Sequence, residues 1–441
     1  MNRAKLMRSR NIGAVLALVL FIVVVMMVIG GGLLTLGATA RIYAIRTAAD
    51  TSAHCAADAG LTKALWKMND MWAKKIFYSS PLPEGTGGGP LDPGWNCDAT
   101  FSYKVAPYYG VFAIITPGAG TVPVANRYVV EGTGRCVAAQ RTVYALLRLQ
   151  GAGDTGILVK DFAILKSGTV VDGRDSRLAP NDPGQFIIPA QMGTSSTADD
   201  KVVLNNGVYV NGDVLVGYLG DPDTGIKDLG ATVTGYKGSL DEEPEFPNVT
   251  APALPIYKNP ITVKGKDETF TPANSGTYPC IDLQQQATVS ARLVISGGKV
   301  VLNLTGNNQG TSIDLGQGCE IVIMPDASLE LYVGGAIKSG EDSGFNNQGK
   351  PTQLKLWGTA NTGKGEPYQD WQLNAKSEYF GQVYAPNASI QINAKGDLYG
   401  AFTAYSFEMK SGGNIYYDAA LRQVDIHDQV ARFVLLRWRE D

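Results

Sequence analysis

The feature that most constrains this chain of 441 residues is an apolar stretch near its start, residues 12–36, which reads IGAVLALVLFIVVVMMVIGGGLLTL. No charged residue occurs between Arg10 and Arg41. A helix of about 20 apolar residues spans the roughly 30 Å hydrocarbon core of a bilayer, whereas a cleaved secretory signal has an apolar core of only about 7 to 15 residues. The stretch therefore predicts a retained, membrane-spanning helix.

Basic residues set the expected orientation of this helix. Residues 1–11 form a basic leader that contains Arg3, Lys5, Arg8 and Arg10. Because basic residues are held on the cytoplasmic side of a membrane, we expect a single-pass protein of the cytoplasmic membrane whose N-terminus is cytoplasmic and whose bulk is periplasmic or extracellular. The formal net charge of −3 gives no electrostatic reason to expect nucleic acid as a partner.

The helical pattern continues beyond the apolar stretch. Apolar residues recur at a spacing of three to four, at Ile42, Ile45, Ala49, Ala56, Leu61, Leu65 and Met68. This spacing is typical of an amphipathic helix, so one long projecting helix is predicted over residues 12–72. Gly30, Gly31 and Gly32 fall inside its apolar part. Because glycines permit close helix approach in lipid, we interpret them as a packing point for partner helices, with tolerated flexibility as the alternative.

The rest of the chain is predicted to be mainly β. Residues 73–94 are rich in Pro and Gly and predict a linker, and the alternating, aromatic-rich runs of residues 95–155 predict a small antiparallel β domain. Short runs separated by Gly or Asn turns predict a parallel, right-handed β-helix solenoid over residues 156–420, with a β-sandwich as the alternative. The acidic, Pro-rich residues 241–255 predict an extended crossing within it. Residues 421–441 are expected to form a C-terminal strand.

Four of the five cysteines lie beyond the predicted helix, where disulfides form in exported proteins. The domain boundary near residue 156 favours the pairs Cys97–Cys136 and Cys280–Cys319, because each bridge then stays within one domain. For the first pair, two buried free thiols are the alternative. No Cys/His spacing of a zinc site occurs and the two histidines are far apart, so neither a metal site nor a Ser-His-Asp triad is expected.

The N-terminal segment AADAGLTKALWKMN resembles that of PilX-type, type IV pilin-like pilus assembly proteins. The family motif A-[ED]-A-G-L-x-x-A-L is matched at Asp58, Ala59, Gly60, Leu61, Ala64 and Leu65. The resemblance implies a prepilin-like cleavage after Gly13 that leaves Ala14 first. The fifth residue is then Leu18 instead of the Glu of major pilins, which favours a minor or accessory subunit. The stretch ARIYAIRT also resembles the anchor of tight-adherence pilus proteins.

A second resemblance lies near the C-terminus. Residues 379–402, YFGQVYAPNASIQINAKGDLYGAF, are similar to the FYGAIYAPNA-type stretch of the β-helical domain attached to PilX-like anchors. Residues 413–421, GNIYYDAAL, are similar to its GxxHYDEAL-type ending, with Tyr416 in place of the usual His. The resemblance implies a solenoid in the cell envelope, but it does not imply an activity.

Solenoids also carry sugar-cleaving enzymes, which need paired carboxylates within about 10 Å. The candidate pairs are Asp172 with Asp175, Asp221 with Asp223, and Glu341 with Asp342. Each pair lies in a turn rich in Gly, Pro or Ser, where solvated carboxylates are ordinary. No catalytic residue, metal or cofactor is therefore expected.

These patterns together predict a non-enzymatic envelope protein, a minor or accessory subunit of a type IV pilus or a related secretion filament, with a β-helix for association or adhesion. The expected partners are the membrane, other pilin-like subunits or further copies of the chain, and envelope polysaccharide. Tyr368 and Trp371 lie in the long polar loop GTANTGKGEPYQDWQ and are the candidate binding surface. The alternative is a membrane-anchored carbohydrate-active β-helix enzyme or a polysaccharide-binding adhesin.

Overall fold

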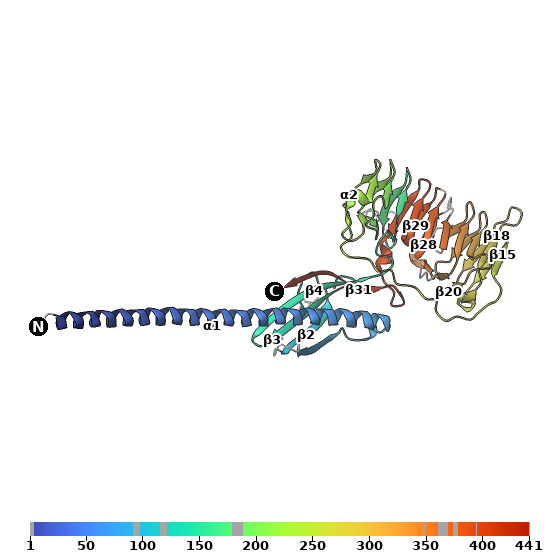
Figure 1. Cartoon of the computed structure of the whole chain (residues 1–441). Helices are drawn as coiled ribbons and strands as arrows, with labels where there is room; N and C mark the ends of the chain where they lie inside the picture. The colour runs from blue at the N-terminus through green and yellow to red at the C-terminus, as the bar shows by residue number, and fades with distance from the viewer. Residues whose placement is uncertain are drawn as a thin grey trace. The chain divides into compact units, whose positions relative to one another are not determined.

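The computed structural model describes residues 4–90, 98–114, 121–178, 188–346, 349–359, 369–373, 378–393 and 395–440, with side chains from Val15 onward. The chain is mainly β with one long N-terminal helix, which confirms the predicted class (Figure 1). It divides into two compact units. The first unit comprises residues 1–148 and 433–441, and the second unit comprises residues 149–432.

Helix α1 runs without a break from Ala4 to Ala73, which is 70 residues or about 105 Å at 1.5 Å per residue. Between residues 15 and 47 its side chains are exposed, apart from the half-buried Gly30. From residue 53 onward one side of the helix is buried on a sheet, through Ala53, Ala56, Ala57, Ala64, Met68 and Trp72. The helix therefore has an uncovered apolar half and a half that packs within the first unit.

The sheet of the first unit has five strands in the order β1–β2–β3–β4–β31. Their bounds are β1 Glu84–Pro90, β2 Asp98–Pro107, β3 Arg127–Cys136, β4 Ala139–Gln150 and β31 Arg432–Glu440. The pairs β1–β2, β2–β3 and β3–β4 are antiparallel, as expected for residues 95–155.

Two glycines of β3 let α1 lie directly against the sheet. A Cβ atom on Gly132 would lie 2.7 Å from the Ala57 carbonyl oxygen, and one on Gly134 would lie 1.9 Å from the Ala53 carbonyl oxygen. Neither distance is compatible with a side chain, so the close approach of helix and strand requires glycine at both positions.

The predicted linker at residues 73–94 contains regular secondary structure. It contains a short 3-10 helix, η1 (Phe77–Ser79), and the edge strand β1, whose sequence is EGTGGGP. A Cβ on Gly87 would lie 2.3 Å from the ring of Phe101 in β2. The glycines of β1 therefore make room for the aromatic rings of β2. Glycine has a low propensity for strands, so the packing against β2 explains why this segment forms a strand.

Strand β31, the predicted C-terminal strand, completes the sheet of the first unit. The ring of Phe433 lies 4.9 Å from that of Phe77 and 5.5 Å from that of Tyr128, between ring centroids. The Asn69 side chain accepts from the Phe433 amide at 2.7 Å and donates to its carbonyl at 3.2 Å. Phe433 is thus near the Tyr128 end of β3, whereas Glu440 lies near Arg141 at the start of β4. Strand β31 therefore runs antiparallel to β4.

The second unit is built of short strands in parallel pairs, and each strand from β5 to β11 and from β15 to β25 pairs with the strand three positions later. This pattern gives three ladders. The first ladder contains β6 (Ala163–Leu165), β9 (Val202–Leu204), β12 (Ile226–Asp228), β15 (Ile261–Lys264), β18 (Ile281–Gln284), β21 (Thr311–Leu315), β24 (Ala336–Ser339) and β27 (Gln369–Leu373). The second contains β7 (Val170–Arg174), β10 (Tyr209–Val210), β13 (Thr232–Val233), β16 (Asp267–Phe270), β19 (Arg292–Ile295), β22 (Glu320–Ile323), β25 (Gly344–Phe345) and β30 (Asn414–Asp418).

The third ladder contains β5 (Ile157–Val159), β8 (Met192–Thr194), β11 (Val214–Val216), β14 (Lys237–Ser239), β17 (Gly276–Tyr278), β20 (Lys299–Leu304), β23 (Ser328–Val333) and β26 (Leu354–Gly358). Two long strands, β28 (Tyr379–Ile392) and β29 (Asp397–Met409), pass through successive ladders. The short helical turns are α2 (Pro222–Gly225), η3 (Pro272–Asn274), η4 (Pro351–Gln353) and η5 (Ala419–Arg422). Parallel pairing excludes the alternative of an antiparallel β-sandwich.

Alternate residues of each strand face inward and stack in columns. One column in the first ladder contains Ile261, Ile281, Ile313, Ile337 and Trp371, all of them buried. Full burial of one such side chain contributes about 1.5–3 kcal/mol. Repetition of these columns along the stack makes the core of the second unit.

The spatial order of the strands differs from their order in the chain. Strand β29 pairs with β5 and β6, and β30 pairs with β7. The chain therefore enters the stack in its middle, β5–β14 extend it on one side, and β15–β28 form the other side (Figure 1). Residues 241–255, the predicted crossing, connect the two ends of the stack without a helix or strand.

This crossing segment is held on the outward side of the third ladder. Val249 is buried with Trp357 and Tyr384, and the Tyr384 hydroxyl donates to the Pro247 carbonyl at 2.9 Å. The Gln429 side chain accepts from the Thr250 amide at 3.1 Å and donates to its carbonyl at 2.8 Å. Aromatic residues on the outside of the third ladder are thus covered by the chain itself.

The two ends of the second unit lie side by side. The Tyr417 hydroxyl donates to the Gly153 carbonyl at 2.9 Å, and a Cβ on Gly153 would lie 2.5 Å from the Leu421 carbonyl oxygen. In the first unit, β4 and β31, which lead into and out of these ends, are neighbouring strands. The second unit is therefore an insertion between two adjacent antiparallel strands, the kind of site that tolerates inserted domains.

This arrangement predicts that the first unit folds without the insertion. We expect a version of it that begins at Arg41, with residues 151–431 replaced by Asn-Gly, to unfold in one cooperative thermal transition, because a two-residue turn joins antiparallel neighbours. The matched control ends at Gln150 and lacks β31. It should melt at a lower temperature or fail to fold, since loss of the buried Phe433 ring alone costs about 3–5 kcal/mol. Equal stability of the two versions would contradict the assignment of β31 to this unit.

Candidate functional site

The uncovered half of α1 is a long, exposed apolar surface. Among the described residues, α1 alone is long and apolar enough to cross a membrane. Its exposed large apolar side chains include Leu16, Leu20, Phe21, Met26, Met27 and Leu34. A single-pass membrane anchor is compatible with this surface, since a soluble unit does not leave so long an apolar stripe in water.

The predicted packing and processing residues all lie on this half of the helix. Gly30, Gly31 and Gly32 have no atom within 4 Å of the position a Cβ would take, so their backbone is open to close approach by another helix. Gly13 and Ala14 are within the helical backbone of α1. Cleavage between them stays a prediction.

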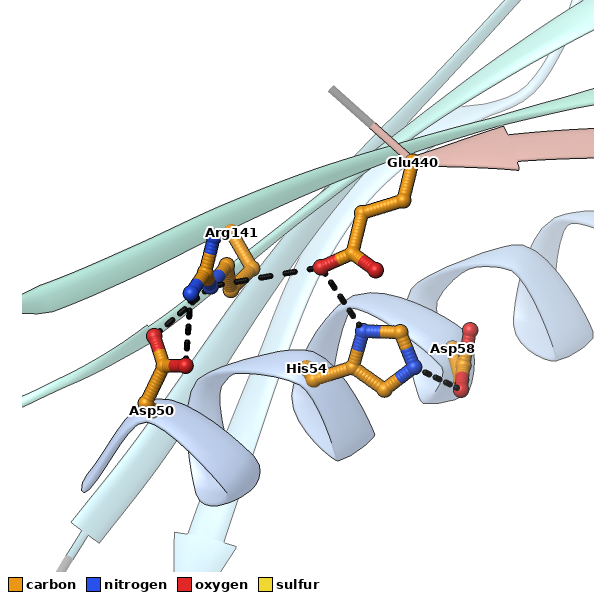
Figure 2. Close-up of polar contacts among 5 residues, drawn as sticks. All are labelled: Asp50, His54, Asp58, Arg141 and Glu440. Atoms are coloured by element: carbon orange, nitrogen blue, oxygen red, sulfur yellow. Dashed lines mark hydrogen bonds and ion pairs between the residues drawn. The ribbon is translucent and has the colours of Figure 1, made fainter. Parts of the chain in front are cut away.

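A polar cluster marks the place where α1 meets the end of the chain (Figure 2). The Arg141 guanidinium donates two hydrogen bonds of 2.6 Å to the Asp50 carboxylate, and its Nε lies 3.9 Å from Glu440 Oε1. On the helix, His54 Nδ1 lies 3.3 Å from Glu440 Oε1 and His54 Nε2 lies 3.4 Å from Asp58 Oδ2. The cluster thus connects α1, β4 and β31.

Hydrogen bonding dominates the electrostatics of this cluster. The hydrogen bonds from Arg141 lower the pKa of Asp50, and the same contacts raise the pKa of Arg141. Both side chains are solvent-exposed, where ion pairs contribute little to stability. Their planar, two-bond geometry fixes direction, so this pair orients β4 on the helix, and Glu440 adds β31 to the cluster. Sequence patterns missed it because Arg141 and Glu440 are far from the helix in the chain.

The cysteines differ in part from the predicted pairing. Cys136 is disulfide-bonded, and its predicted partner, Cys97, lies outside the described residues. Cys280 and Cys319 are free and buried, so the predicted bridge between them is wrong. Cys280 directly precedes β18 of the first ladder, whereas Cys319 directly precedes β22 of the second. The Cys319 sulfur instead accepts a hydrogen bond from the Ala291 amide at 3.4 Å.

The three cysteines that are free in the described part of the chain should differ in the rate at which their thiols react. Burial raises the pKa of Cys280 and of Cys319, so at pH 8 less of each is the reactive thiolate, and access is blocked as well. We expect iodoacetamide to label the exposed Cys55 in the native protein and the two buried thiols only after unfolding. Peptide mapping by mass spectrometry measures this order. Native labelling of Cys280 as fast as that of Cys55, or a peptide joined through Cys280 and Cys319, would contradict the structure.

Trp371 does not contribute to the predicted aromatic binding surface. Tyr368 lies outside the described residues, and Trp371 is 0% exposed, so the prediction of an exposed Trp371 is wrong. Its segment is strand β27 and not a loop. Alternation along that strand places Asp370 outward and Trp371 inward, where its Nε1 donates to the Gly335 carbonyl at 3.2 Å.

Substitution of Trp371 should therefore affect stability. In the second unit, Trp371→Ala is expected to lower the free energy of unfolding by about 3–5 kcal/mol, since it leaves a large core cavity. Trp371→Phe keeps most of the ring volume and loses the hydrogen bond, so a loss of about 1–2 kcal/mol is expected. Urea unfolding of residues 149–432, followed by circular dichroism, measures both. A Trp371→Ala protein as stable as the wild type would show that this ring is not a core residue.

A second group of aromatic residues lies on the outward side of the second ladder. The ring centroids of Phe380 and Tyr399 are 4.3 Å apart, those of Tyr399 and Tyr416 are 5.0 Å apart, and both pairs are stacked. The Arg174 guanidinium lies 4.4 Å from the Tyr399 centroid. Because the ring faces contact one another and the guanidinium, this group stabilises neighbouring strands. In the sequence, Tyr416 was noted only because the resembling family usually has His at this position.

Three of the six candidate carboxylates, those of Asp172, Asp175 and Asp221, accept hydrogen bonds from neighbouring groups. Asp175 accepts a hydrogen bond of 2.8 Å from Arg177 Nε, which lowers the pKa of Asp175. Asp172 accepts from the Asn211 amide group at 2.7 Å, and Asp221 caps α2 by accepting from the Asp223 amide at 3.0 Å. Among the described residues no group of three or more His, Cys, Asp or Glu could hold a metal ion.

Comparison with known proteins adds little to this geometry. The model of a domain of unknown function, DUF7305, matches residues 257–424, which is less than half of the chain. That range begins just after the crossing segment and leaves out β5–β14. No curated protein matches the chain.

Two solved structures show a low overall similarity. The competence-associated pilin ComZ from Thermus thermophilus is similar over 89% of this chain and 97% of its own, with 11% identity and a TM-score of 0.27. An ice-binding protein from the Antarctic ascomycete Antarctomyces psychrotrophicus is similar over 60% of this chain and 96% of its own, with 14% identity and a TM-score of 0.26. TM-scores this low do not show a shared fold over the whole chain.

Proposed function

We propose that this chain is a non-enzymatic, pilin-like envelope protein. In this proposal α1 is inserted in the cytoplasmic membrane and packs against the helices of other pilin-like subunits or of further copies. The second unit is a β-helix presented outside the cytoplasm for association or adhesion. The chain serves as a minor or accessory subunit, because Leu18 stands where major pilins carry Glu.

The observation that carries the proposal is the division of α1. One unbroken helix has an apolar half that no other described residue covers and a second half buried on an antiparallel sheet. A helix built in this way holds a folded unit at a fixed distance from a membrane or from a bundle of like helices. The motif segment supports this role, since Ala57 lies directly against Gly132 of β3 and Gly60 lies against Ser102 of β2.

The parallel ladders support the β-helix. Most strands pair in parallel with the strand three positions along the chain, and the inward columns are mostly aliphatic. Such a stack is a rigid, extended scaffold. The enzymatic alternative has less support, because three of its six candidate carboxylates bind neighbouring amides and a guanidinium group.

Replacement of the glycine triplet tests the role of the helix. We expect Gly30→Leu, Gly31→Leu and Gly32→Leu together to reduce co-purification of two differently tagged copies, or of co-expressed pilin-like subunits, because leucine keeps helices apart. The matched control replaces the same glycines by Ala, which stays small and should preserve association. Both versions should remain in the membrane fraction, since each substitution adds apolar surface. Equal co-purification of the Leu and Ala versions would refute the packing role.

The same preparations test processing and orientation. Mass spectrometry of the native N-terminus should find Ala14 first, and protease added outside the cytoplasmic membrane should digest both units. An intact Met1 would remove the prepilin-like part of the proposal, and protection of both units would reverse the orientation.

A further inference from the structure

The β3–β4 turn carries a valine that is exposed to solvent and has a backbone conformation unfavourable for valine. Val137 is 86% exposed, and its φ is +54°. This left-handed conformation is an outlier for a β-branched residue and is ordinary for Gly or Asn. Ala138, beside it, is also exposed. An environment other than water would favour this pair of side chains.

The turn lies at the end of the first unit from which the apolar half of α1 emerges. Helix and strand run in opposite directions, because Ala57 contacts Gly132 and Ala53 contacts Gly134. Val137 and Ala138 therefore line one side of a shallow groove of about 490 Å³, with Ile45 and Arg46 of α1 on the other. Residues 121–126, at the start of β3, lie at the opposite end of the sheet.

Helix geometry places this groove at membrane level. The charge-free part of α1 ends at Arg41, and Ile45 follows only about 6 Å further along the axis at 1.5 Å per residue. The polar headgroup layer is roughly 5–8 Å thick on each side of a bilayer. The charge-free stretch, residues 11–40, is about 45 Å long as a helix and so exceeds the roughly 30 Å core. Such an excess makes a helix tilt, which brings one edge of the attached unit toward the lipid.

Residues of the groove and of the adjoining turn of α1 suit a membrane interface. Ile45 lines the groove, and Tyr43 lies two residues earlier, on another side of the helix; both are exposed, and aromatic residues such as Tyr43 gather at the headgroup level. Arg41 and Arg46 are exposed and suit lipid phosphates. Among the described residues, the carboxylates at this end are those of Asp50, which is paired with Arg141, of Glu440 in the same cluster, and of Asp98, which lies in a separate pocket with Arg135.

We propose that the β3–β4 turn, with Tyr43 and Ile45 of α1, is a second membrane contact that inserts Val137 and Ala138 into the headgroup layer on the outer side of the cytoplasmic membrane. The occupant of the groove is a lipid surface. The contact fixes the direction in which α1 tilts and holds the sheet at the bilayer. It rests on the proposed membrane anchoring by α1.

Depth-dependent quenching tests the proposal on the full chain. The protein is reconstituted into vesicles of phosphatidylcholine and phosphatidylglycerol, with a genetically encoded fluorescent amino acid at position 137, which avoids a new thiol beside the disulfide of Cys136. The control carries the fluorophore at position 122, where the native valine is 80% exposed at the far end of the sheet. We expect nitroxide-labelled lipids to quench at position 137, at a depth of about 5–10 Å, and iodide in the buffer to quench at position 122.

A negative charge introduced at the β3–β4 turn should move the turn out of the lipid and into the buffer. With the fluorophore at position 138, Val137→Asp should reduce quenching by lipid and increase quenching by iodide, while Val122→Asp should leave both unchanged. Quenching by iodide alone at position 137, in protein that resists carbonate extraction, would overturn the contact and leave the anchor intact. Shielding from both quenchers would overturn it in favour of a second copy at the groove. Carbonate-extractable protein would refute the anchor and the contact together.

Discussion

Backbone pairing between β29 and the strands β5 and β6 is the interaction on which the rest of the structure depends. Together with the pairing of β30 and β7, it joins the stack of β5–β14 to the stack of β15–β28. Without it, each stack would end in a row of unpaired amides and carbonyls, which is an aggregation-prone edge. The same pairing brings residues 153 and 421 together, so that the chain leaves the second unit where it entered. The sheet of the first unit can then contain both β4 and β31.

Local patterns predicted much of this architecture. The apolar run and its amphipathic continuation predicted α1 because a helical period repeats over many turns, and short alternating runs predicted parallel strands. Even the crossing at residues 241–255 was recognisable, since acidic, Pro-rich sequence cannot join a ladder. These features depend on neighbours in the chain, which the sequence shows directly.

The failures all concern partners that are distant in the chain. The bridge between Cys280 and Cys319 was wrong because adjacency to a strand does not reveal which ladder that strand joins. Trp371 was placed in a polar loop, yet register with Ile337 and Ile390 turns it inward. The glycines of β1 suggested a linker because the rings of β2 that need their space follow later in the sequence. Nothing in the sequence indicated a role for Glu440, because its contacts with Arg141 and His54 form only when β31 pairs in the sheet.

The position of β31 also makes the first unit depend on residues that follow the second unit in the chain. These nine residues are synthesised only after the strands β5–β30. Until they arrive, Trp72, Phe77 and Tyr128 lack the ring of Phe433, and β4 is an open edge. A chain that stops within the second unit can form α1 and β1–β4, but it cannot close the sheet on which α1 packs. Strand β31 thus couples completion of the first unit to synthesis of the whole second unit.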